Sequence, residues 1–230
     1  MSYRSIFTRR DQLVYASRGV MTVRTRDGTW VVPPQRAVWI PARIPHGISM
    51  SGAVSMRTLY LRCRLVRPLP RNCCVLNVSS LLRELILHAC RFPALEKSVK
   101  VQAHLVEVIV DQLETVQAIP LQLTSPVDPR AIRVAQALSD DPSGSRSLEE
   151  TCRIAGASKR TIERLFQQET RLTLGQWRQQ LRLMRSLQLL AAGENITHVA
   201  LEAGYSTPSA YIAMFRKILG ITPGRYFEAR

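Results

Sequence analysis

Two stretches of the C-terminal half carry the residues whose types and spacing point most clearly to chemistry, and both follow one plan. A short helical segment ends at an Ala-Gly pair, a hydroxyl residue follows, and a second helical segment begins. Residues 148–158 lead in this way into 159–166, and residues 196–207 lead into 208–215. Glycine allows a left-handed turn, the hydroxyl caps the second helix, and small residues permit a close crossing. This pattern is typical of a helix-turn-helix, whose second helix enters the major groove of duplex DNA.

The repetition of this plan makes the signal stronger. A single helix–glycine–helix corner is common in ordinary helical bundles. Here Gly156 and Gly204 lie 48 residues apart, and one long helical segment from about residue 174 to residue 192 joins them. The sequence therefore predicts two helix-turn-helix units, at 148–169 and 196–219, held apart by one helix.

Other chemistry has little support in the sequence. We find no paired carboxylates, no nucleophile beside a base and no phosphate-cradling glycine loop, so we predict no catalytic residues, no enzyme and no cofactor. The five cysteines have no zinc-ribbon or disulfide spacing and are interpreted as buried reduced thiols. The adjacent Cys73 and Cys74 leave redox or metal sensing as an alternative. His88, His104 and His198 are isolated, so we expect no metal site.

Charge and hydropathy indicate which classes of partner the protein can bind. The 230 residues include 32 Lys and Arg against 17 Asp and Glu, a net charge of +15, which favours a polyanionic partner. No apolar run approaches the roughly 20 residues of a membrane span, and the first residues lack the apolar stretch of a signal peptide. We therefore expect no membrane partner and a cytoplasmic location.

The periodicities predict an α+β fold, in which a small antiparallel β-barrel or sandwich with a helical pair precedes an all-helical domain. Val108, Ile109 and Val110 make the second helix of the pair apolar around much of its girth, so it could also pack against a partner chain in a homodimer. The expected parts are residues 1–70 with strands near 13–16, 20–25, 30–32 and 54–66, the helical pair at 77–118, a proline-rich linker at 119–128 and seven helices at 129–230.

Capping residues mark the boundaries of these seven helices. Ser147 with Glu150 predicts a capping box, and a proline follows Asp128, Thr207 and Thr222 at the first helical position. In the long joining helix an apolar stripe predicts core residues at Leu174, Trp177, Leu181, Met184 and Leu187. Arg178, Arg182 and Arg185 lie on another face of that helix. This arginine face is either solvated or in contact with phosphate.

Residues 129–230 resemble the DNA-binding domain of the AraC/XylS family of bacterial transcription regulators. The resemblance is most specific in Ala200-x-x-Ala203-Gly204-Tyr205, Pro208-Ser209-Ala210-Tyr211, Phe215-Arg216, Gly220-Ile221-Thr222-Pro223 and Tyr226. It implies a sequence-specific regulator that binds double-stranded DNA and recruits or blocks RNA polymerase. Its two recognition helices would read major-groove segments about 34 Å apart on one face of the duplex.

The resemblance also implies residue roles. In the first unit the base-facing positions fall on Arg160, Glu163 and Arg164, whose types suit guanine and cytosine, and Ser158, Lys159 and Thr161 lie at the helix start, where phosphate would bind. In the second unit the base-facing positions are Ser209, Ile212 and Ala213, shorter or less polar than in many relatives. We therefore expect the first unit to supply most hydrogen-bonded specificity. The second unit would supply methyl contacts and phosphate anchoring through Thr207, Arg216 and Lys217.

Residues 12–66 resemble the cupin-like sensor arm of one AraC subgroup, which implies an unknown small-molecule effector. The paired histidines that bind metal in cupin enzymes are absent, and only His46 remains. The sheet is expected to lack its first strands, leaving an exposed edge or an incomplete pocket. Inward-facing aromatic residues are the candidate effector ligands, with ordinary barrel core as the alternative: Tyr15, Trp30, Trp39, His46 and Tyr60.

Two other functions stay open on the sequence. The chain could be a metal-dependent cupin enzyme with a helical tail, which stoichiometric metal would support. It could also be a non-specific nucleic-acid-binding protein, which would bind any duplex equally and with a steep salt dependence.

Overall fold

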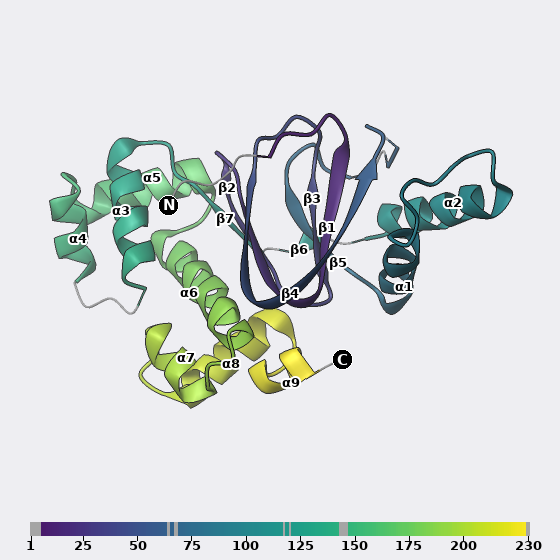
Figure 1. Cartoon of the computed structure of the whole chain (residues 1–230). Helices are drawn as coiled ribbons and strands as arrows, with labels where there is room; N and C mark the ends of the chain where they lie inside the picture. The colour runs from purple at the N-terminus through teal and green to yellow at the C-terminus, as the bar shows by residue number, and fades with distance from the viewer. Residues whose placement is uncertain are drawn as a thin grey trace. The chain divides into compact units, whose positions relative to one another are not determined.

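The computed structural model describes residues 6–63, 65–66, 69–116, 118–119, 121–142 and 147–228 (Figure 1). The chain divides into two compact units. The first comprises Met1–Arg26 and Trp30–Gln122, and the second comprises Asp27–Thr29 and Leu123–Arg230. The α+β fold predicted from the sequence is confirmed.

The first unit is built around one long strand, β1 (Asp11–Arg24). β4 (Gly47–Leu61) pairs with it antiparallel from end to end, and β3 (Arg36–Ile40) and β2 (Gly28–Val32) pair on its other side. The sheet order is β6-β5-β3-β1-β2-β7 with β4 beside β1, and the sheet curls into a half-barrel (Figure 1). The remaining strands are β5 (Cys74–Asn77), β6 (Ala118–Ile119) and β7 (Gln122–Thr124).

A bulge in β1 accompanies this curl. The register between β1 and β4 shifts twice between Ala16 and Val20, and Gly19 lies there with φ +73°. A Cβ at Gly19 would lie 2.7 Å from the Ala53 carbonyl oxygen, so this position needs glycine for both its backbone angle and its space.

Several strand boundaries differ from the sequence prediction. The strands predicted at 13–16 and 20–25 are one strand, because the bulge bends β1 without ending its pairing with β4. The strand predicted at 54–66 begins earlier, at Gly47, and ends at Leu61, since the length of β1 sets its ends. The sequence did not predict β3, β5, β6 or β7. β3 is buried on both faces and lacks alternation, and β7 lies inside the predicted linker.

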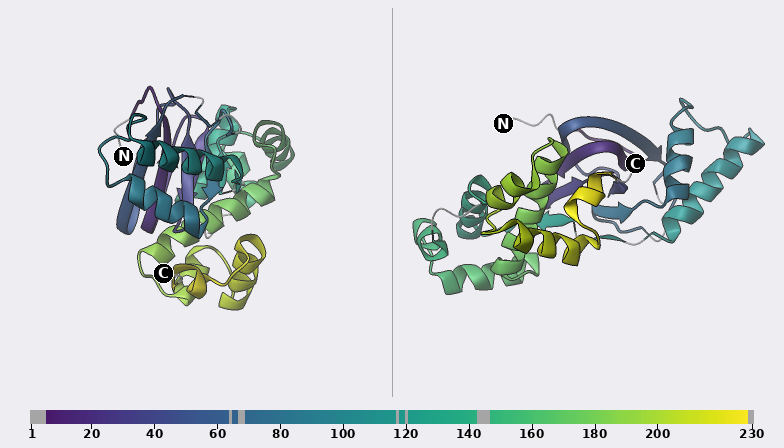
Figure 2. Two further views of the ribbon diagram at one scale, coloured as in Figure 1. Left: turned by 90° about the vertical axis from the view of Figure 1, so that its right-hand side faces the viewer. Right: turned by 90° about the horizontal axis from the view of Figure 1, so that it is seen from below.

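The predicted helical pair is present as α1 (Ser80–Ala89) and α2 (Lys100–Glu114), which lie side by side over one face of the sheet (Figure 2). Each helix buries apolar side chains about one turn apart against this face. Leu82 and Ile86 do so on α1, and Ile109 and Leu113 on α2. The helical pair and the sheet therefore share one apolar core.

The second unit is helical and contains seven helices among its described residues, as the sequence predicted. Oxygen side chains cap six of them at Asp128, Ser147, Ser158, Thr173, Asn195 and Thr207. A reciprocal capping box forms at Thr173 and Gln176, which the sequence did not single out. The helices are α3 (Pro129–Asp140), α4 (Leu148–Ile154), α5 (Lys159–Thr170), α6 (Leu174–Ala191), α7 (Ile196–Glu202), α8 (Pro208–Leu219) and α9 (Pro223–Glu228).

Within the described ranges, none of the helices has both the length and the apolar character needed to cross a bilayer.

Candidate nucleic-acid interface

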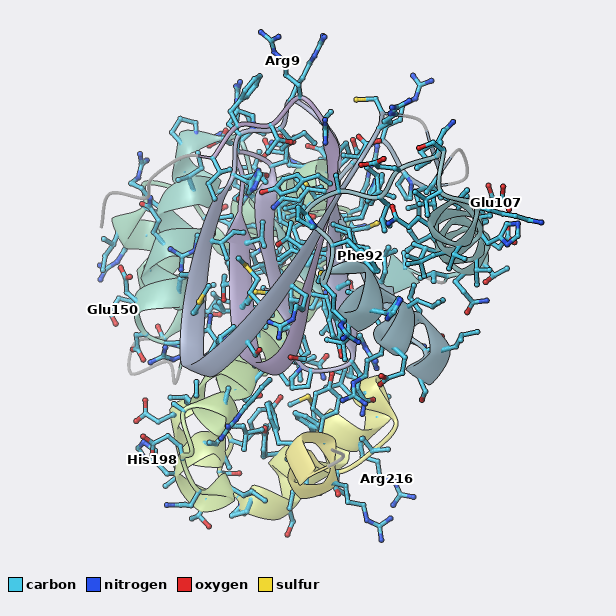
Figure 3. All side chains as sticks on the ribbon, turned by 45° about the vertical axis from the view of Figure 1, so that its right-hand side comes forward. Arg9, Phe92, Glu107, Glu150, His198 and Arg216 are labelled. Atoms are coloured by element: carbon cyan, nitrogen blue, oxygen red, sulfur yellow. The ribbon has the colours of Figure 1, made fainter. Side chains whose placement is uncertain are left out.

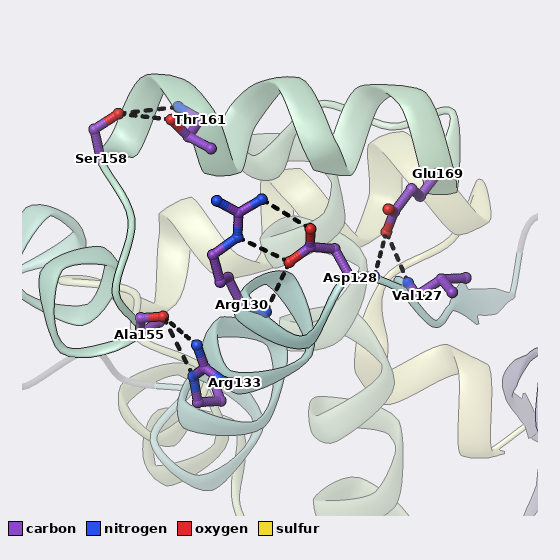
Figure 4. Close-up of polar contacts among 8 residues, drawn as sticks. All are labelled: Val127, Asp128, Arg130, Arg133, Ala155, Ser158, Thr161 and Glu169. Carbon is purple, nitrogen blue, oxygen red and sulfur yellow. Dashed lines mark hydrogen bonds and ion pairs between the residues drawn. The ribbon is translucent and has the colours of Figure 1, made fainter.

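The first helix-turn-helix corner is formed by α4 and α5. The chain leaves α4 through Ala155, reverses at Gly156 with φ +79°, and enters α5 at Ser158, whose hydroxyl accepts a hydrogen bond from the Thr161 amide at 3.2 Å. Arg133 of α3 donates to the Ala155 carbonyl oxygen from Nη2 at 2.7 Å and from Nε at 3.3 Å (Figure 4). A cap and a charged side chain therefore fix the start of α5.

The second corner repeats this construction with α7 and α8. Gly204 has φ +74°, the Tyr205 amide donates to the Ala200 carbonyl oxygen at 2.9 Å, and Thr207 accepts from the Ala210 amide at 3.2 Å. Ala200 and Ala203 are fully buried, so their small size allows α7 and α8 to approach closely. Both recognition helices thus begin at a side-chain cap that follows a left-handed glycine.

α5 has one buried face and one exposed face. Ile162, Leu165 and Phe166 are buried, whereas Arg160, Glu163 and Arg164 are exposed. The structure therefore brings the three predicted base-facing residues onto one face, next to the exposed Ser158 and the half-buried Lys159 and Thr161. Neither Arg160 nor Arg164 makes an ion pair within the described residues, so their guanidinium groups are available to an anionic partner.

Lys159 has an internal partner. Its Nζ lies 2.8 Å from Glu149 Oε1 of α4, and this contact lowers the pKa of Glu149 and raises the pKa of Lys159. A phosphate at the start of α5 would have to compete with this carboxylate for the ammonium group.

α8 is arranged in the same way. Tyr211, Met214 and Phe215 are buried, with Phe215 edge-on to Tyr226 of α9 at 5.6 Å between ring centroids. Figure 3 shows Arg216 projecting away from the helices of this unit. The predicted contact residues of the second unit lie on the opposite side from the core: Thr207, Ser209, Ala213, Arg216 and Lys217 are exposed and Ile212 is half-buried.

The strut between the corners is α6, whose buried residues include four of the five predicted: Leu174, Trp177, Met184 and Leu187. Leu181 is only partly buried. The Trp177 indole packs edge-on against Phe166 of α5 at 5.3 Å and donates to the Thr124 carbonyl oxygen at 2.9 Å. The strut is therefore anchored in the same core as the first recognition helix.

Arg182 of α6 has an internal role that the sequence did not reveal. Its Nε donates to the Pro142 carbonyl oxygen at 3.2 Å, and its guanidinium lies 5.6 Å from the ring centroid of Tyr205. Desolvation by burial, followed by the charge of Arg178, lowers the pKa of Arg182. This side chain connects the segment before the first corner with the turn of the second.

Glu169 was also not identified from the sequence. Its Oε2 accepts from the backbone amides of Val127 and Asp128 at 2.7 and 3.1 Å, which holds the entry to α3 against the end of α5 (Figure 4). The contact joins residues more than forty positions apart, and no local pattern could have signalled it.

The five candidate effector residues of the first unit are not brought together. Tyr15 and Trp39 belong to the core beneath α1 and α2, Trp30 donates from its indole to Gln122 Oε1 at 3.3 Å, and Tyr60 is exposed. His46 is buried, and its Nδ1 lies 2.9 Å from the Ile44 carbonyl oxygen. The alternative interpretation, ordinary core, fits the surroundings of Tyr15 and Trp39.

Two further expectations concern the burial of the cysteines and the absence of a metal site, and both can be examined among the described residues. Four of the five cysteines are buried or partly buried, and Cys63 is exposed, contrary to the expectation for all five. Burial raises the pKa of Cys74 to about 11, so its thiol stays protonated at neutral pH and is a poor nucleophile. Over the described ranges no three His, Cys, Asp or Glu side chains group in a way that could hold a metal ion.

Comparison with known proteins agrees with this geometry. Residues 151–229 match the "Helix-turn-helix domain" family, and residues 10–174 match the "AraC-like ligand binding domain" family. The chain belongs to the AraC family. It is 34% identical to the HTH-type transcriptional regulator NimR of Escherichia coli K12 over 95% of this chain and 80% of NimR.

Two other matches each cover less than half of this chain. The chain is 35% identical to the HTH-type transcriptional regulator RipA of Corynebacterium glutamicum over 44% of this chain and 30% of RipA. Among solved structures, the DNA-binding domain of AdpA in complex with a target DNA is 28% identical, with a TM-score of 0.41, over 45% of this chain and 93% of that one. The chain is thus a DNA-binding transcriptional regulator with a ligand-binding domain of the AraC type, and the curated relatives it matches are all regulators.

Proposed function

We propose that this regulator grips one side of a DNA duplex by placing α5 and α8 in successive major-groove segments. The observation that supports this most directly is that both helices start at capped glycine corners within one compact unit and direct their polar, charged or small residues away from its core. A helix of this kind fits a major groove about 12 Å wide.

In this proposal α5 reads base edges. Arg160 and Arg164 are the donors that suit guanine O6 and N7, and Glu163 is an acceptor that suits cytosine N4. Ser158, Lys159 and Thr161, with the backbone amides at the start of the helix, bind phosphate.

α8 contributes a different kind of contact. Ile212 and Ala213 offer methyl groups to thymine, and Ser209 offers one short hydroxyl. Thr207, Arg216 and Lys217 hold the adjoining phosphates. Most of the sequence specificity therefore comes from the first corner.

We further propose that the protein acts on RNA polymerase as an activator or a repressor without catalytic activity of its own, that the first unit responds to a small molecule, and that α2 mediates a homodimer. Val101 and Val108 of α2 are 76% and 40% exposed, which supports the last of these because apolar side chains in such positions favour a partner helix.

The test is selection of preferred sites from random duplex DNA with the wild-type protein and with Arg164→Ala. Loss of one bidentate contact should weaken binding by about 1–3 kcal/mol and relax selection at one base pair. Arg91→Ala, an exposed arginine of the first unit, serves as the charge-matched control. Equal enrichment of all sequences by the wild-type protein would instead indicate a non-specific nucleic-acid-binding protein.

A further inference from the structure

The first unit contains a pocket that, of the five candidate effector residues, only Tyr60 lines. It has a volume of about 710 Å³ and lies between the Met56–Leu61 end of β4, the chain around Phe92–Leu95 and one side of α2. β4 pairs only with β1 among the described strands, so no described strand covers the other edge of β4. In Figure 3, Phe92 lies on the side of the helical pair that faces the sheet, whereas Glu107 lies on the far side of α2. We call this cavity the β4–α2 pocket.

The floor of the β4–α2 pocket is apolar. Ile109 of α2 is a buried core residue, and Leu59, Leu65 and Leu95 pack against the same core cluster. Burying the apolar part of a ligand on such a surface stabilises the complex by about 25 cal/mol per Å² of apolar area removed from water.

The ionisable walls of the β4–α2 pocket are cationic. Arg10, Arg57, Arg62 and Lys97 line it, and no Asp or Glu does. None of the four makes an ion pair within the described part of the chain. Arg57 donates from one terminal nitrogen, Nη1, to Ser55 Oγ at 3.1 Å and to the Met56 carbonyl oxygen at 2.9 Å. Its other N–H groups can therefore donate to a ligand.

We propose that the β4–α2 pocket binds a small amphipathic organic anion, with its apolar body on the leucine floor and its carboxylate or sulfonate among the arginines. The combination favours this class over two others: a neutral hydrophobe gains no attraction from the cations, and an inorganic anion leaves the apolar floor in water. As the site of an effector, this inference rests on the proposed regulatory function.

The pocket lies against α2, so a bound ligand can affect the parts of the chain that α2 contacts or leads into. Val106, Ile109 and Val110 come from α2, so a bound molecule touches this helix directly. α2 also carries the exposed valines of the proposed dimer surface, and the chain runs from its end through β6 and β7 into the second unit.

The probe for the test is 8-anilino-1-naphthalenesulfonate, with N-phenyl-1-naphthylamine as the same aromatic body without the sulfonate. With the full-length protein we expect saturable fluorescence enhancement by the sulfonate. The double variant Arg57→Gln, Arg62→Gln should weaken sulfonate binding about tenfold or more, because a hydrogen bond to a charged group is lost, and change binding of the neutral probe less than about twofold. Arg18→Gln, an exposed arginine of the same unit outside the pocket, is the matched control and should change neither.

A second variant tests the location independently of charge. Val110→Trp fills the pocket from α2 and should abolish binding of both probes while the far-ultraviolet circular dichroism keeps its folded form. The arginine variants alone decide the matter if this variant does not fold. The inference is overturned if the sulfonate does not bind saturably, if the two probes respond equally to the arginine variants, or if Arg18→Gln weakens binding as much.

Site selection from random DNA, performed without a probe, separates this inference from the proposed function. Selected DNA with no saturable sulfonate binding would overturn only the pocket. Saturable sulfonate binding with no selected DNA would overturn only the proposed mode of DNA recognition.

Discussion

Arg182→Gln tests whether the contacts of Arg182 with Pro142 and Tyr205 stabilise the arrangement of the two helix-turn-helix corners. The substitution removes the hydrogen bond from Nε to the Pro142 carbonyl oxygen and the contact with the Tyr205 ring. It also leaves a polar but uncharged side chain that is too short to reach both partners. The second unit should therefore become less stable, although no DNA-facing residue has changed.

The distances set the size of the effect. The hydrogen bond is at the long end at 3.2 Å, so it contributes about 1.5 kcal/mol, the lower value for a charged donor. The ring contact at 5.6 Å is near the outer limit and adds about 0.5 kcal/mol. The expected loss is about 2 kcal/mol, which for a unit of this size lowers the melting temperature by roughly 5–10 °C.

Urea unfolding followed by far-ultraviolet circular dichroism measures this loss, because the helices of the second unit contribute much of that signal. Arg185→Gln is the matched control, since Arg185 is exposed on the same helix and loses the same charge. Arg182→Lys should fall between wild type and Arg182→Gln, because it keeps the charge but not the planar donor group. Equal stability of the Arg182→Gln and Arg185→Gln proteins would refute the reasoning.

Three further predictions concern single contacts. Glu149→Gln frees Lys159 from its 2.8 Å ion pair and makes its charge available to a DNA phosphate. In a salt titration, the slope of log affinity for DNA against log salt concentration should therefore steepen by about 1. An unchanged slope would mean that Lys159 does not reach phosphate. Arg130 lowers the pKa of Asp128 to about 2 by hydrogen bonding, so the stabilisation is complete above the ordinary Asp pKa and disappears as the pH falls through about 2. Asp128→Asn should therefore flatten the fall in melting temperature between pH 4 and pH 2, and parallel curves would contradict this. Gly156→Ala meets only ordinary contacts, the nearest at 3.7 Å, so left-handed strain alone should cost about 1–2 kcal/mol in urea unfolding; wild-type stability would show that φ +79° is not required.

The helical unit was largely predictable because its signals are local. A side-chain oxygen before six of the seven helices, a proline at the first position of α3 and α8 and a glycine at each corner act within four residues of the boundary, and the structure uses all three. The exposed positions of Arg160 and Arg164 follow from the same 3.6-residue period that buries Ile162, Leu165 and Phe166.

What the sequence did not reveal depends on distant partners. The strands β3 and β5 exist because each pairs with a strand far along the chain, and a strand buried on both faces shows no alternation. The sequence predicts only a solvated or phosphate-binding role for Arg182. The Pro142 carbonyl and the Tyr205 ring that it contacts lie 40 and 23 positions from it along the chain. The five candidate effector residues lie in different surroundings for a similar reason, because residue type alone does not tell which face of the sheet the helical pair covers.

The measurement that tests the central claim most directly is hydroxyl-radical footprinting of the protein on a DNA site selected by it. Two recognition helices joined by α6 predict two protected backbone segments on the same face of the duplex, about ten base pairs apart. A single protected segment, or two segments on opposite faces, would contradict the claim that α5 and α8 enter successive turns of the major groove.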